Sequence, residues 1–397
     1  MKHILRKIIF GFIAFAAVFI IGRGIFKSNP EAVVKNLLSQ ADITVNGDRP
    51  SDITVDNTGV YARVLGQGSL GLGESYMDGW WDCPALDQFF FKLFSVDIQH
   101  KVPKNFNAIF AYLKSKFINM QSKERAFQVG QQHYDLGDDL FKAMLDKRMI
   151  YSCAYWKHAK DLDQAQEKKL ELICKKLQLK PGMKLLDIGC GWGGLALYAA
   201  QNCGVSVLGV TISKEQAKYA QEMSKNYPVE IRLQDYRDLN EQFDRIVSVG
   251  MFEHVGYKNY QTFIDVCHRL LKDDGLMLLH TIGGNQSWTT GDEWINAYIF
   301  PNGMLPSIAQ IATTLEGKFV MEDWHNFGAD YDKTLMAWHA NFERNWPQLQ
   351  PKYGDRFKRM WDYYLLSCAG LFRAREIQLW QIVLSKKGVM GGYESVR

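Results

Sequence analysis

Paired cysteines are missing from this sequence of 397 residues. Its seven cysteines are odd in number and scattered, and no two of them are spaced as Cys-x-x-Cys. This usage argues against a disulfide framework and against a zinc site, and it favours a reducing compartment. We therefore expect no metal site. The cysteines are Cys83, Cys153, Cys174, Cys190, Cys203, Cys267 and Cys368.

A strong excess of charge is also missing. With 47 Lys and Arg against 43 Asp and Glu, the net charge is +4, too small to favour nucleic-acid binding. Positive charge gathers locally in residues 101–125, where six basic residues mix with apolar ones and Glu124 is the one acidic residue. This mixture suits an anionic lipid surface, and a solvated helix face beside a domain linker is the alternative.

No apolar run in the sequence reaches the roughly 20 residues that span a bilayer. The longest N-terminal run, Ile8 to Gly22, has 15 residues, is flanked by Lys7 and Arg23, and precedes no small-residue cleavage site. We interpret residues 1–28 as an apolar leader that acts as a membrane anchor or interfacial helix. A misassigned start codon would also explain the segment.

The length exceeds that of a usual single domain, so we expect two units with separate cores. The predicted division is the leader 1–28, a small N-terminal domain 29–100, a basic linker 101–125 and a larger domain 126–397. Within the small domain we expect a helix around Glu31 to Ala41. The glycines of residues 66–76 predict a break in regular structure. The aromatic cluster that follows is interpreted as core, with a lipid-facing patch as the alternative.

Short apolar strands alternate with helical segments from Gly182 onward. This alternation is typical of a parallel sheet with helices on both faces. We expect strands at 184–188, 205–210, 231–233, 245–249 and 276–279, with the apolar run 379–384 as a closing strand. The expected helices are 194–201, 214–226 and 260–271.

The first of these strands ends in a glycine-rich turn with the pattern Asp-x-Gly-x-Gly-x-Gly. The turn runs from Asp187 to Gly193 and leads into a predicted helix, whose N-terminus favours a carboxylate. A dinucleotide site would have Gly-x-Gly-x-x-Gly and an acidic residue at the end of the second strand, where this chain has none. The pattern fits the nucleotide-binding loop of class I methyltransferases better. A turn that is only glycine-rich is the plain alternative.

Polar residues follow the next two predicted strands. Thr211 and Gln216 follow the second strand, and Asp235, Tyr236 and Arg237 follow the third. Ligands of open α/β sheets bind at these strand ends. The hydroxyl, amide and acidic groups are therefore candidates to meet a ribose and an adenine, although each alone is more typical of a cap or turn.

Several further motifs give the chain a resemblance to one enzyme family. They include Tyr151-Ser152-Cys153-Ala154-Tyr155-Trp156, the glycine loop, the segment 250–256, the segment 279–283, and 368–370. Together they resemble the bacterial cyclopropane-fatty-acyl-phospholipid synthases from about Asn29 to Lys386. The mycobacterial cyclopropane mycolic acid synthases share the larger domain but lack the N-terminal unit, so phospholipid is the better-matched substrate. The charged leader departs from the usual start of the family.

The resemblance implies a class I methyltransferase fold, which is a Rossmann-like α/β domain with a seven-stranded sheet, and a smaller N-terminal α+β lipid-binding domain. It implies a homodimer, S-adenosylmethionine as the methylene donor, a bicarbonate ion, and a cytoplasmic enzyme on the inner face of the membrane. The implied donor-binding residues are Tyr151, Ser152, Leu185, Leu186, Asp187, Ile188, Gly189, Cys190, Gly191, Trp192, Gly193, Thr211, Ser213, Gln216, Asp235, Tyr236 and Arg237. The implied bicarbonate-binding residues are Cys153, Glu253, His280, Ile282 and Tyr331, and Cys368 matches a cysteine marked as active.

These groups suit the chemistry that the resemblance implies. An alkene is a poor nucleophile and needs a strong electrophile such as a sulfonium methyl, and its attack leaves a carbocation on the acyl chain. A base must then remove a proton from the added carbon so that the ring can close. A small held anion can do this, and His280 and Tyr331 have hydrogen-bonding groups fit to hold it, with Glu253 to orient it. Cys368 has no part in this scheme.

Three alternatives remain open from the residues. Methyl transfer could stop at a branched methyl or methylene fatty acid, because both outcomes share the same cation. A lipid-binding protein could retain the fold without catalysis. The chain could also be a small-molecule amine or oxygen methyltransferase, but that function would not explain the aromatic N-terminal unit or the basic segment 101–125.

Overall fold

The structure is a computed structural model that describes residues 29–96 and 137–397. The predicted leader 1–28 and basic linker 101–125 lie outside the described residues. Among the helices of residues 29–96 and 137–397, none combines the length and apolar character that a membrane span requires.

A seven-stranded sheet forms the centre of the larger unit, with the strand order β5-β4-β3-β6-β7-β9-β8. The expected parallel arrangement is right for the first five strands of this order and wrong for the last two, because β9 pairs antiparallel with both β7 and β8. Apolar patterning marks a strand but not its direction, and β8 was not predicted. The strands are β3 (Lys184–Ile188), β4 (Ser206–Thr211), β5 (Val229–Leu233), β6 (Phe243–Val249), β7 (Leu271–Gly284), β8 (Val320–Asn326) and β9 (Ile377–Ser385).

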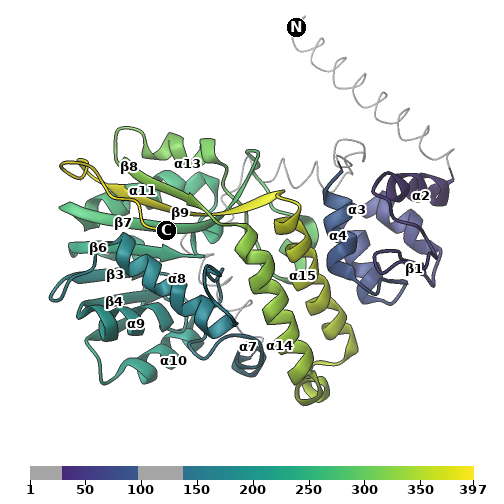
Figure 1. Cartoon of the computed structure of the whole chain (residues 1–397), viewed down its shortest axis with the longest axis horizontal. Helices are drawn as coiled ribbons and strands as arrows, with labels where there is room; N and C mark the ends of the chain where they lie inside the picture. The colour runs from purple at the N-terminus through teal and green to yellow at the C-terminus, as the bar shows by residue number, and fades with distance from the viewer. Residues whose placement is uncertain (1–28, 97–136) are drawn as a thin grey trace, which may run out of the picture.

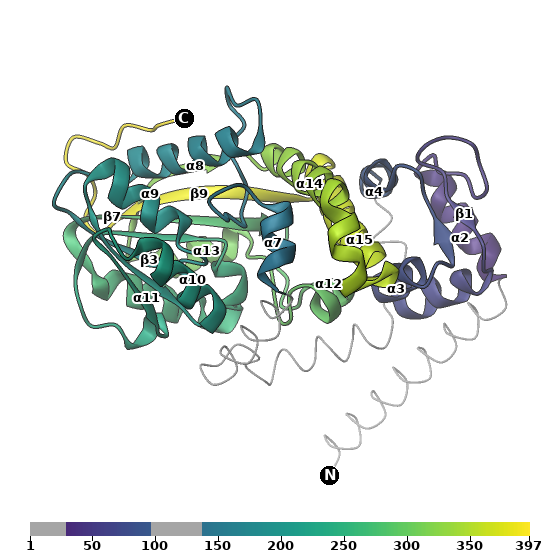
Figure 2. The ribbon, with the colours of Figure 1, turned by 90° about the horizontal axis from the view of Figure 1, so that it is seen from below.

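Helices cover both faces of this sheet, as the sequence predicts (Figure 2). Alternate residues of each strand point to opposite faces. Leu185 and Val207 therefore pack with α8 (Leu162–Lys176) and α9 (Gly194–Cys203), whereas Leu186 and Leu208 pack with α11 (Tyr260–Leu270) and α13 (Ile308–Leu315). Helix α10 (Lys214–Ser224) packs against β4 and β5. Because helices cover both faces of the sheet, the strands carry apolar residues on both faces.

Two long helices lie between the sheet and the N-terminal unit (Figure 1). They are α14 (Ala329–Tyr353) and α15 (Asp355–Arg373), joined at Gly354, whose φ of 74° favours glycine. Helix α7 (Asp138–Met144) packs on α14, and α15 packs on the N-terminal unit. A short helix, α12 (Glu293–Tyr298), also contacts that unit.

Within residues 29–96, the N-terminal unit has three helices and a small antiparallel pair of strands. The predicted break in residues 66–76 is confirmed at one position, Gly68 (φ 59°, ψ −132°), where α3 kinks, whereas the glycines that follow it are helical. These glycines allow close packing: a Cβ on Gly73 would lie 2.3 Å from Trp294 Cδ1. Tertiary packing thus outweighs the low helix propensity of glycine. The elements are α2 (Pro30–Gln40), β1 (Thr54–Val55), α3 (Gly59–Met77), β2 (Trp81–Asp82) and α4 (Leu86–Phe94).

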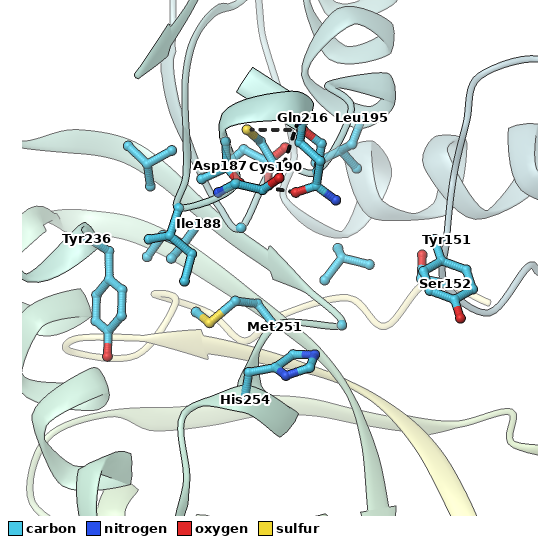
Figure 3. Close-up of a pocket in the computed structure, with 18 of the residues that line it drawn as sticks. Tyr151, Ser152, Asp187, Ile188, Cys190, Leu195, Gln216, Tyr236, Met251 and His254 are labelled. Carbon is cyan, nitrogen blue, oxygen red and sulfur yellow. Dashed lines mark hydrogen bonds between the residues drawn. The ribbon is translucent and has the colours of Figure 1, made fainter. Parts of the chain in front are cut away.

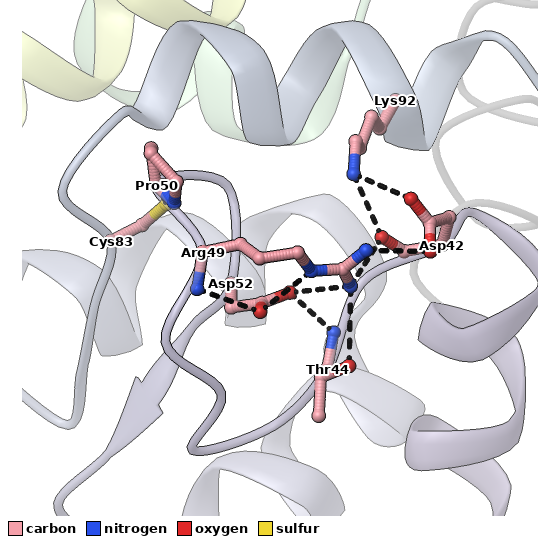
Figure 4. Close-up of polar contacts among 7 residues, drawn as sticks. All are labelled: Asp42, Thr44, Arg49, Pro50, Asp52, Cys83 and Lys92. Atoms are coloured by element: carbon pink, nitrogen blue, oxygen red, sulfur yellow. Dashed lines mark hydrogen bonds and ion pairs between the residues drawn. The ribbon is translucent and has the colours of Figure 1, made fainter.

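A polar network fixes the loop that precedes β1 (Figure 4). The guanidinium of Arg49 donates to Asp52 Oδ1 at 2.9 Å and to Asp42 Oδ1 at 2.7 Å. Lys92 of α4 donates to Asp42 Oδ2 at 2.8 Å, which ties the loop to that helix. Charge-assisted bonds of this kind hold the loop in one geometry, and they place Ile53 against a large cavity described below.

Candidate active site

The turn between β3 and α9 has the geometry that its glycines permit. Gly189, Gly191 and Gly193 have φ values of 83°, 55° and 84°, a region that disfavours side chains. Gly193 is the residue before α9, so the backbone enters the helix directly from this turn. A Cβ on Gly191 would meet no heavy atom within 4 Å, so open space adjoins the backbone there.

A cavity of about 200 Å³ lies beside this turn (Figure 3). Of the predicted donor-binding residues, Leu185, Leu186 and Gly193 do not line it. Leu185 and Leu186 are buried in the core on opposite faces of the sheet. The other predicted residues come together around the cavity: Tyr151, Ser152, Asp187, Ile188, Gly189, Cys190, Gly191, Trp192, Thr211, Ser213, Gln216, Asp235, Tyr236 and Arg237.

Several of the polar side chains in this first cavity are already fixed. Ser213 accepts from Gln216 N and so caps α10, and Thr211 Oγ1 donates to Gln216 Oε1 at 3.1 Å. Asp235 accepts from the Arg237 guanidinium, with Nη2 2.6 Å from Oδ2. These contacts hold the strand ends in place and leave a concave site between them.

Asp187 differs from these residues because one of its oxygens is unsatisfied. The side chain is 2% exposed, and its Oδ2 has no hydrogen-bond partner among the described residues. Burial raises the pKa of Asp187 to about 7, although the nearby Lys169 ammonium opposes the rise. Buried polar atoms normally have a hydrogen-bond partner, and a donor group on a bound ligand would provide one for Asp187 Oδ2.

A second cavity of about 840 Å³ lies between the N-terminal unit and the larger unit. Leu38, Phe89 and Phe90 line it from the N-terminal unit, and Leu335 and Phe372 line it from α14 and α15. Trp81 also lines it, so part of the aromatic cluster is both buried core and cavity wall. The lining is largely apolar and suits an aliphatic chain.

The two cavities share part of their lining. Tyr151, Gly250 and His254 line both of them. Burial lowers the pKa of His254 to about 4, so its imidazole is neutral at pH 7. The hydroxyl groups of Tyr151 and Tyr364 lie 2.8 Å apart and hold the Tyr151 ring at this junction. The boundary between the two cavities is therefore formed by uncharged residues, and a ligand in the first cavity lies next to a ligand in the second.

Part of the predicted bicarbonate set lines the second cavity near this junction. Glu253, Ile282 and Tyr331 all line it, as does Cys368. Glu253 Oε1 accepts from the backbone N–H of Ile282 at 2.7 Å, and Glu253 Oε2 has no partner among the described residues. Burial raises the pKa of Glu253 to about 7, although bonds from Ile282, its own backbone and Thr281 oppose the rise.

The remaining two members of that set, Cys153 and His280, line neither cavity. Cys153 is fully buried beside Tyr331, whose pKa is raised well above its usual range by burial, with Cys153 and Glu253 adding to the effect. His280 is 1% exposed on β7, with Gln381 Nε2 3.3 Å from its Nδ1 and its Nε2 without a partner in the described chain. Burial lowers the pKa of His280 well below its usual value, so the ring is neutral.

Neither cysteine of the predicted site is a thiolate. Burial raises the pKa of Cys368 to about 12 and that of Cys153 well above its usual range. A thiol is a poor nucleophile in its protonated form. The geometry places both cysteines as neutral groups around Tyr331.

Lys169, Gly250 and His254 line the site but were not predicted as site residues. Lys169 lies in a helix rich in charged residues, where a lysine usually faces solvent. His254 follows Glu253 directly, in the segment after strand β6. Only its place at a strand end pointed to the cavity.

Comparisons with known proteins give consistent matches to cyclopropane synthases. A family model described as mycolic acid cyclopropane synthetase matches residues 121–382. The cyclopropane-fatty-acyl-phospholipid synthase of Escherichia coli is 59% identical over 365 residues, covering 92% of this chain and 95% of that protein. Cyclopropane mycolic acid synthase 1 of Mycobacterium tuberculosis is 36% identical over 69% of this chain and 99% of its own length. A solved mycolic acid cyclopropane synthase complexed with SAH and CTAB has 37% identity and a TM-score of 0.61, covering 66% of this chain and 98% of that one.

Proposed function

The chain belongs to the cyclopropane-fatty-acyl-phospholipid synthase family, and we propose that it acts on cis double bonds in the acyl chains of membrane phospholipids. It is an S-adenosylmethionine-dependent enzyme that transfers a methylene carbon to lipid acyl chains and forms cyclopropane fatty acids. The observation that carries the proposal is the pair of adjoining cavities, one beside the glycine turn and the polar strand ends, the other larger and lined mostly by apolar side chains, with Tyr151, Gly250 and His254 lining both.

The first cavity fits S-adenosylmethionine. The glycine turn lets a ligand approach the backbone, and Asp187 offers an unpartnered oxygen to the positively charged amino-acid end. Gln216, in the first turn of α10 after β4, and Asp235, after β5, both line the cavity, where they would meet the ribose and adenine. When bound, the donor supplies an electrophilic methyl group on a sulfonium.

The second cavity would hold the unsaturated acyl chain. Its apolar walls exclude water, which protects a cationic acyl intermediate from hydrolysis. Because His254 is neutral, the junction adds no positive charge that would oppose the developing cation. Tyr331 and Phe372 stack at 4.5 Å on the cavity wall, and aromatic faces of this kind can steady cationic character.

The polar end of the second cavity fits a bicarbonate ion. Glu253 Oε2 is free to accept its O–H, and the neutral Tyr331 phenol can donate to one of its oxygens. The resemblance assigns His280 to the same ion. Although His280 lines neither cavity, Gln381 beside its Nδ1 leaves the buried Nε2 to carry the hydrogen, and Nε2 has no partner among the described residues. When bound, bicarbonate would supply the base that deprotonates the added carbon. The role of Ile282 is to fix Glu253 through its backbone N–H.

We also propose that the enzyme is cytoplasmic and peripherally associated with the inner face of the membrane. Trp288 is 51% exposed and lines the second cavity. Ile308, 55% exposed, begins α13, whose Gln310 Nε2 donates to Trp288 O at 2.9 Å. Exposed apolar side chains at a cavity mouth suit a lipid surface. The basic composition of residues 101–125 and the apolar leader 1–28 support the same location.

The domain division stays as predicted, with boundaries near residues 28, 100 and 125. We propose a homodimer on the resemblance to the family. Light scattering of the purified protein, with and without vesicles, measures the oligomeric state directly.

One experiment tests the proposed reaction. The full chain is incubated with S-adenosylmethionine labelled with ¹³C in the methyl group and with vesicles of unsaturated phospholipid, and the lipids are analysed by mass spectrometry and NMR. We expect the label in a cyclopropane methylene of an intact phospholipid. Label in a branched methyl or exocyclic methylene group would replace the proposed product, and absence of label from lipid would contradict catalysis. Removal of dissolved bicarbonate should slow the reaction, and an unchanged rate would contradict the bound-ion proposal.

A further inference from the structure

Two buried lysines on helix α8 differ in whether the protein provides a counter-ion. Lys176 is fully buried and lies 3.5 Å from Asp323 Oδ2. Lys169, two turns earlier and 1% exposed, forms no ion pair with any carboxylate of the described residues. Burying a charged ammonium without a partner is costly. A buried charge in this state is explained if its partner arrives with a ligand.

Lys169 faces the first cavity. It lines that cavity together with Asp187, and its Nζ donates to Ser152 Oγ at 2.7 Å. An ammonium has three N–H donors, so two of them remain without an acceptor among the described side chains. Gln166, one turn earlier, donates to Ser152 O at 2.9 Å and helps hold the Ser152 segment in place. The Lys169 ammonium is therefore held at the cavity wall by Ser152, whose backbone is itself held by Gln166.

The lysine also lies close to the unsatisfied carboxylate of Asp187. Burial lowers the pKa of Lys169 to about 8, while Asp146, Cys153 and Asp187 oppose the fall. Asp146 is occupied by other donors, because its Oδ1 accepts from Ile150 N at 2.8 Å and its Oδ2 accepts from Arg148 N at 3.0 Å. The cavity therefore presents one available cationic group and one available anionic group near each other.

The amino-acid end of S-adenosylmethionine is a zwitterion with matching charges. Resting on the proposed use of that donor, we propose that the Lys169 ammonium binds its α-carboxylate while the Asp187 carboxylate receives its α-ammonium. The Ser152 hydroxyl, which accepts from Lys169, completes the carboxylate site. This arrangement fixes the amino-acid end and so the direction in which the sulfonium methyl points.

Equilibrium binding tests the proposal without any turnover. Isothermal titration calorimetry compares S-adenosylhomocysteine with its decarboxylated analogue, which keeps the amine and the adenosine, on the wild type, Lys169→Met and Lys176→Met. We expect the wild type to bind S-adenosylhomocysteine about 10- to 100-fold more tightly, the range for a hydrogen bond to a charged group. Lys169→Met should lose most of that preference. Lys176→Met, a matched buried lysine on the same helix, should keep it.

Methylthioadenosine, which lacks the amino-acid end, serves as the control ligand. It should bind the wild type and Lys169→Met equally if the variant is folded. If Lys169 only supported Ser152, Lys169→Met would weaken the binding of S-adenosylhomocysteine and of its decarboxylated analogue by the same factor. The preference for S-adenosylhomocysteine would then remain, which would overturn the proposal. Should the variant not fold, equal binding of the two ligands by the wild type would overturn it as well. If the wild type bound none of the three ligands, the proposed donor itself would be wrong.

Discussion

The backbone N–H of Ile282 donates to Glu253 Oε1 at 2.7 Å. This bond links the strand β7 to the short 3-10 helix Phe252–His254 and holds one oxygen of the Glu253 carboxylate. Oε1 is held by the protein, and Oε2 is left without a partner among the described residues. The carboxylate therefore has a fixed orientation and one open acceptor, which is what a residue that orients a small oxyanion needs.

Turnover should rise with pH through the neutral range because of Glu253. Its pKa is raised to about 7 by burial, so the carboxylate that accepts the bicarbonate O–H is mostly protonated at pH 6 and mostly ionised at pH 8. We expect kcat at saturating donor to increase over this interval, with the bicarbonate concentration held constant. Saturation with donor removes the contribution of Asp187, whose pKa is also about 7 but which acts in donor binding.

Glu253→Gln provides the control for this pH dependence. The amide keeps the shape of the side chain but cannot change its charge, so kcat should fall by about 100-fold or more and its pH profile should become flat in this range. Affinity for S-adenosylhomocysteine should stay within about threefold of the wild type. A pH profile that is unchanged in the variant would assign the titration to another group.

Tyr331→Phe should lower turnover while leaving donor binding intact. The hydroxyl of Tyr331 is a neutral donor next to Glu253 and Cys153, and its loss leaves the held anion with one hydrogen bond fewer. We expect kcat to fall by about 10- to 100-fold, the range for a bond to a charged group, with a higher bicarbonate concentration needed for half-maximal rate. Tyr363→Phe is the matched control, since Tyr363 also lines the second cavity but lies by Phe90. Equal losses in both variants would point to cavity packing instead.

The folded chain shows which parts of this site the sequence could predict. The glycine turn and the polar strand ends follow from local pattern, because short spacing and strand periodicity fix which residues meet at the edge of a parallel sheet. Leu185 and Leu186 belong to the same motif by sequence, yet their side chains enter the core because they lie within the strand. Cys153 comes near Tyr331 only because α14 packs against the segment that contains Cys153, with Ala154 N donating to Thr334 Oγ1, and no local sequence pattern contains this contact.

Larger features of the fold escaped prediction for related reasons. The direction of β9 depends on how α14 and α15 return the chain to the sheet, not on the apolar residues of the strand. The glycines of α3 predicted a break, which occurs at Gly68. Gly73 instead lies within helix and allows close contact with Trp294 of a distant helix, a role that local propensity does not reveal. Lys169 was not predicted as a site residue because a lysine in a charged helix usually faces solvent, and the sequence does not show that a cavity lies beside it.

Cys368→Ala should reduce turnover by less than about threefold. Burial raises the pKa of this thiol to about 12, so it is protonated at neutral pH and is not a ready nucleophile. The thiol nevertheless lines the acyl cavity, so a bulky group attached to it would block the cavity. We therefore expect Cys368→Phe, which places a bulky side chain in the cavity, to lose far more turnover than Cys368→Ala. A loss of 100-fold or more in Cys368→Ala, with thermal stability unchanged, would show a chemical role for the thiol.

Trp288→Ser and Ile308→Ser should weaken binding to phospholipid vesicles. Both side chains are about half exposed. Trp288 lines the second cavity, and Ile308 begins α13, whose Gln310 donates to the Trp288 carbonyl oxygen. Transfer of such apolar surface into the membrane interface contributes on the order of 1 kcal/mol per side chain, so each variant should lose about 3- to 10-fold in vesicle affinity. Co-sedimentation with vesicles of mixed zwitterionic and anionic lipid measures this loss. Met223→Ser on α10 is the matched control, because Met223 is 49% exposed but lines neither cavity. If all three variants bound vesicles as the wild type does, the membrane would have to meet the protein elsewhere, and the cavity opening would receive its acyl chain without insertion of these side chains.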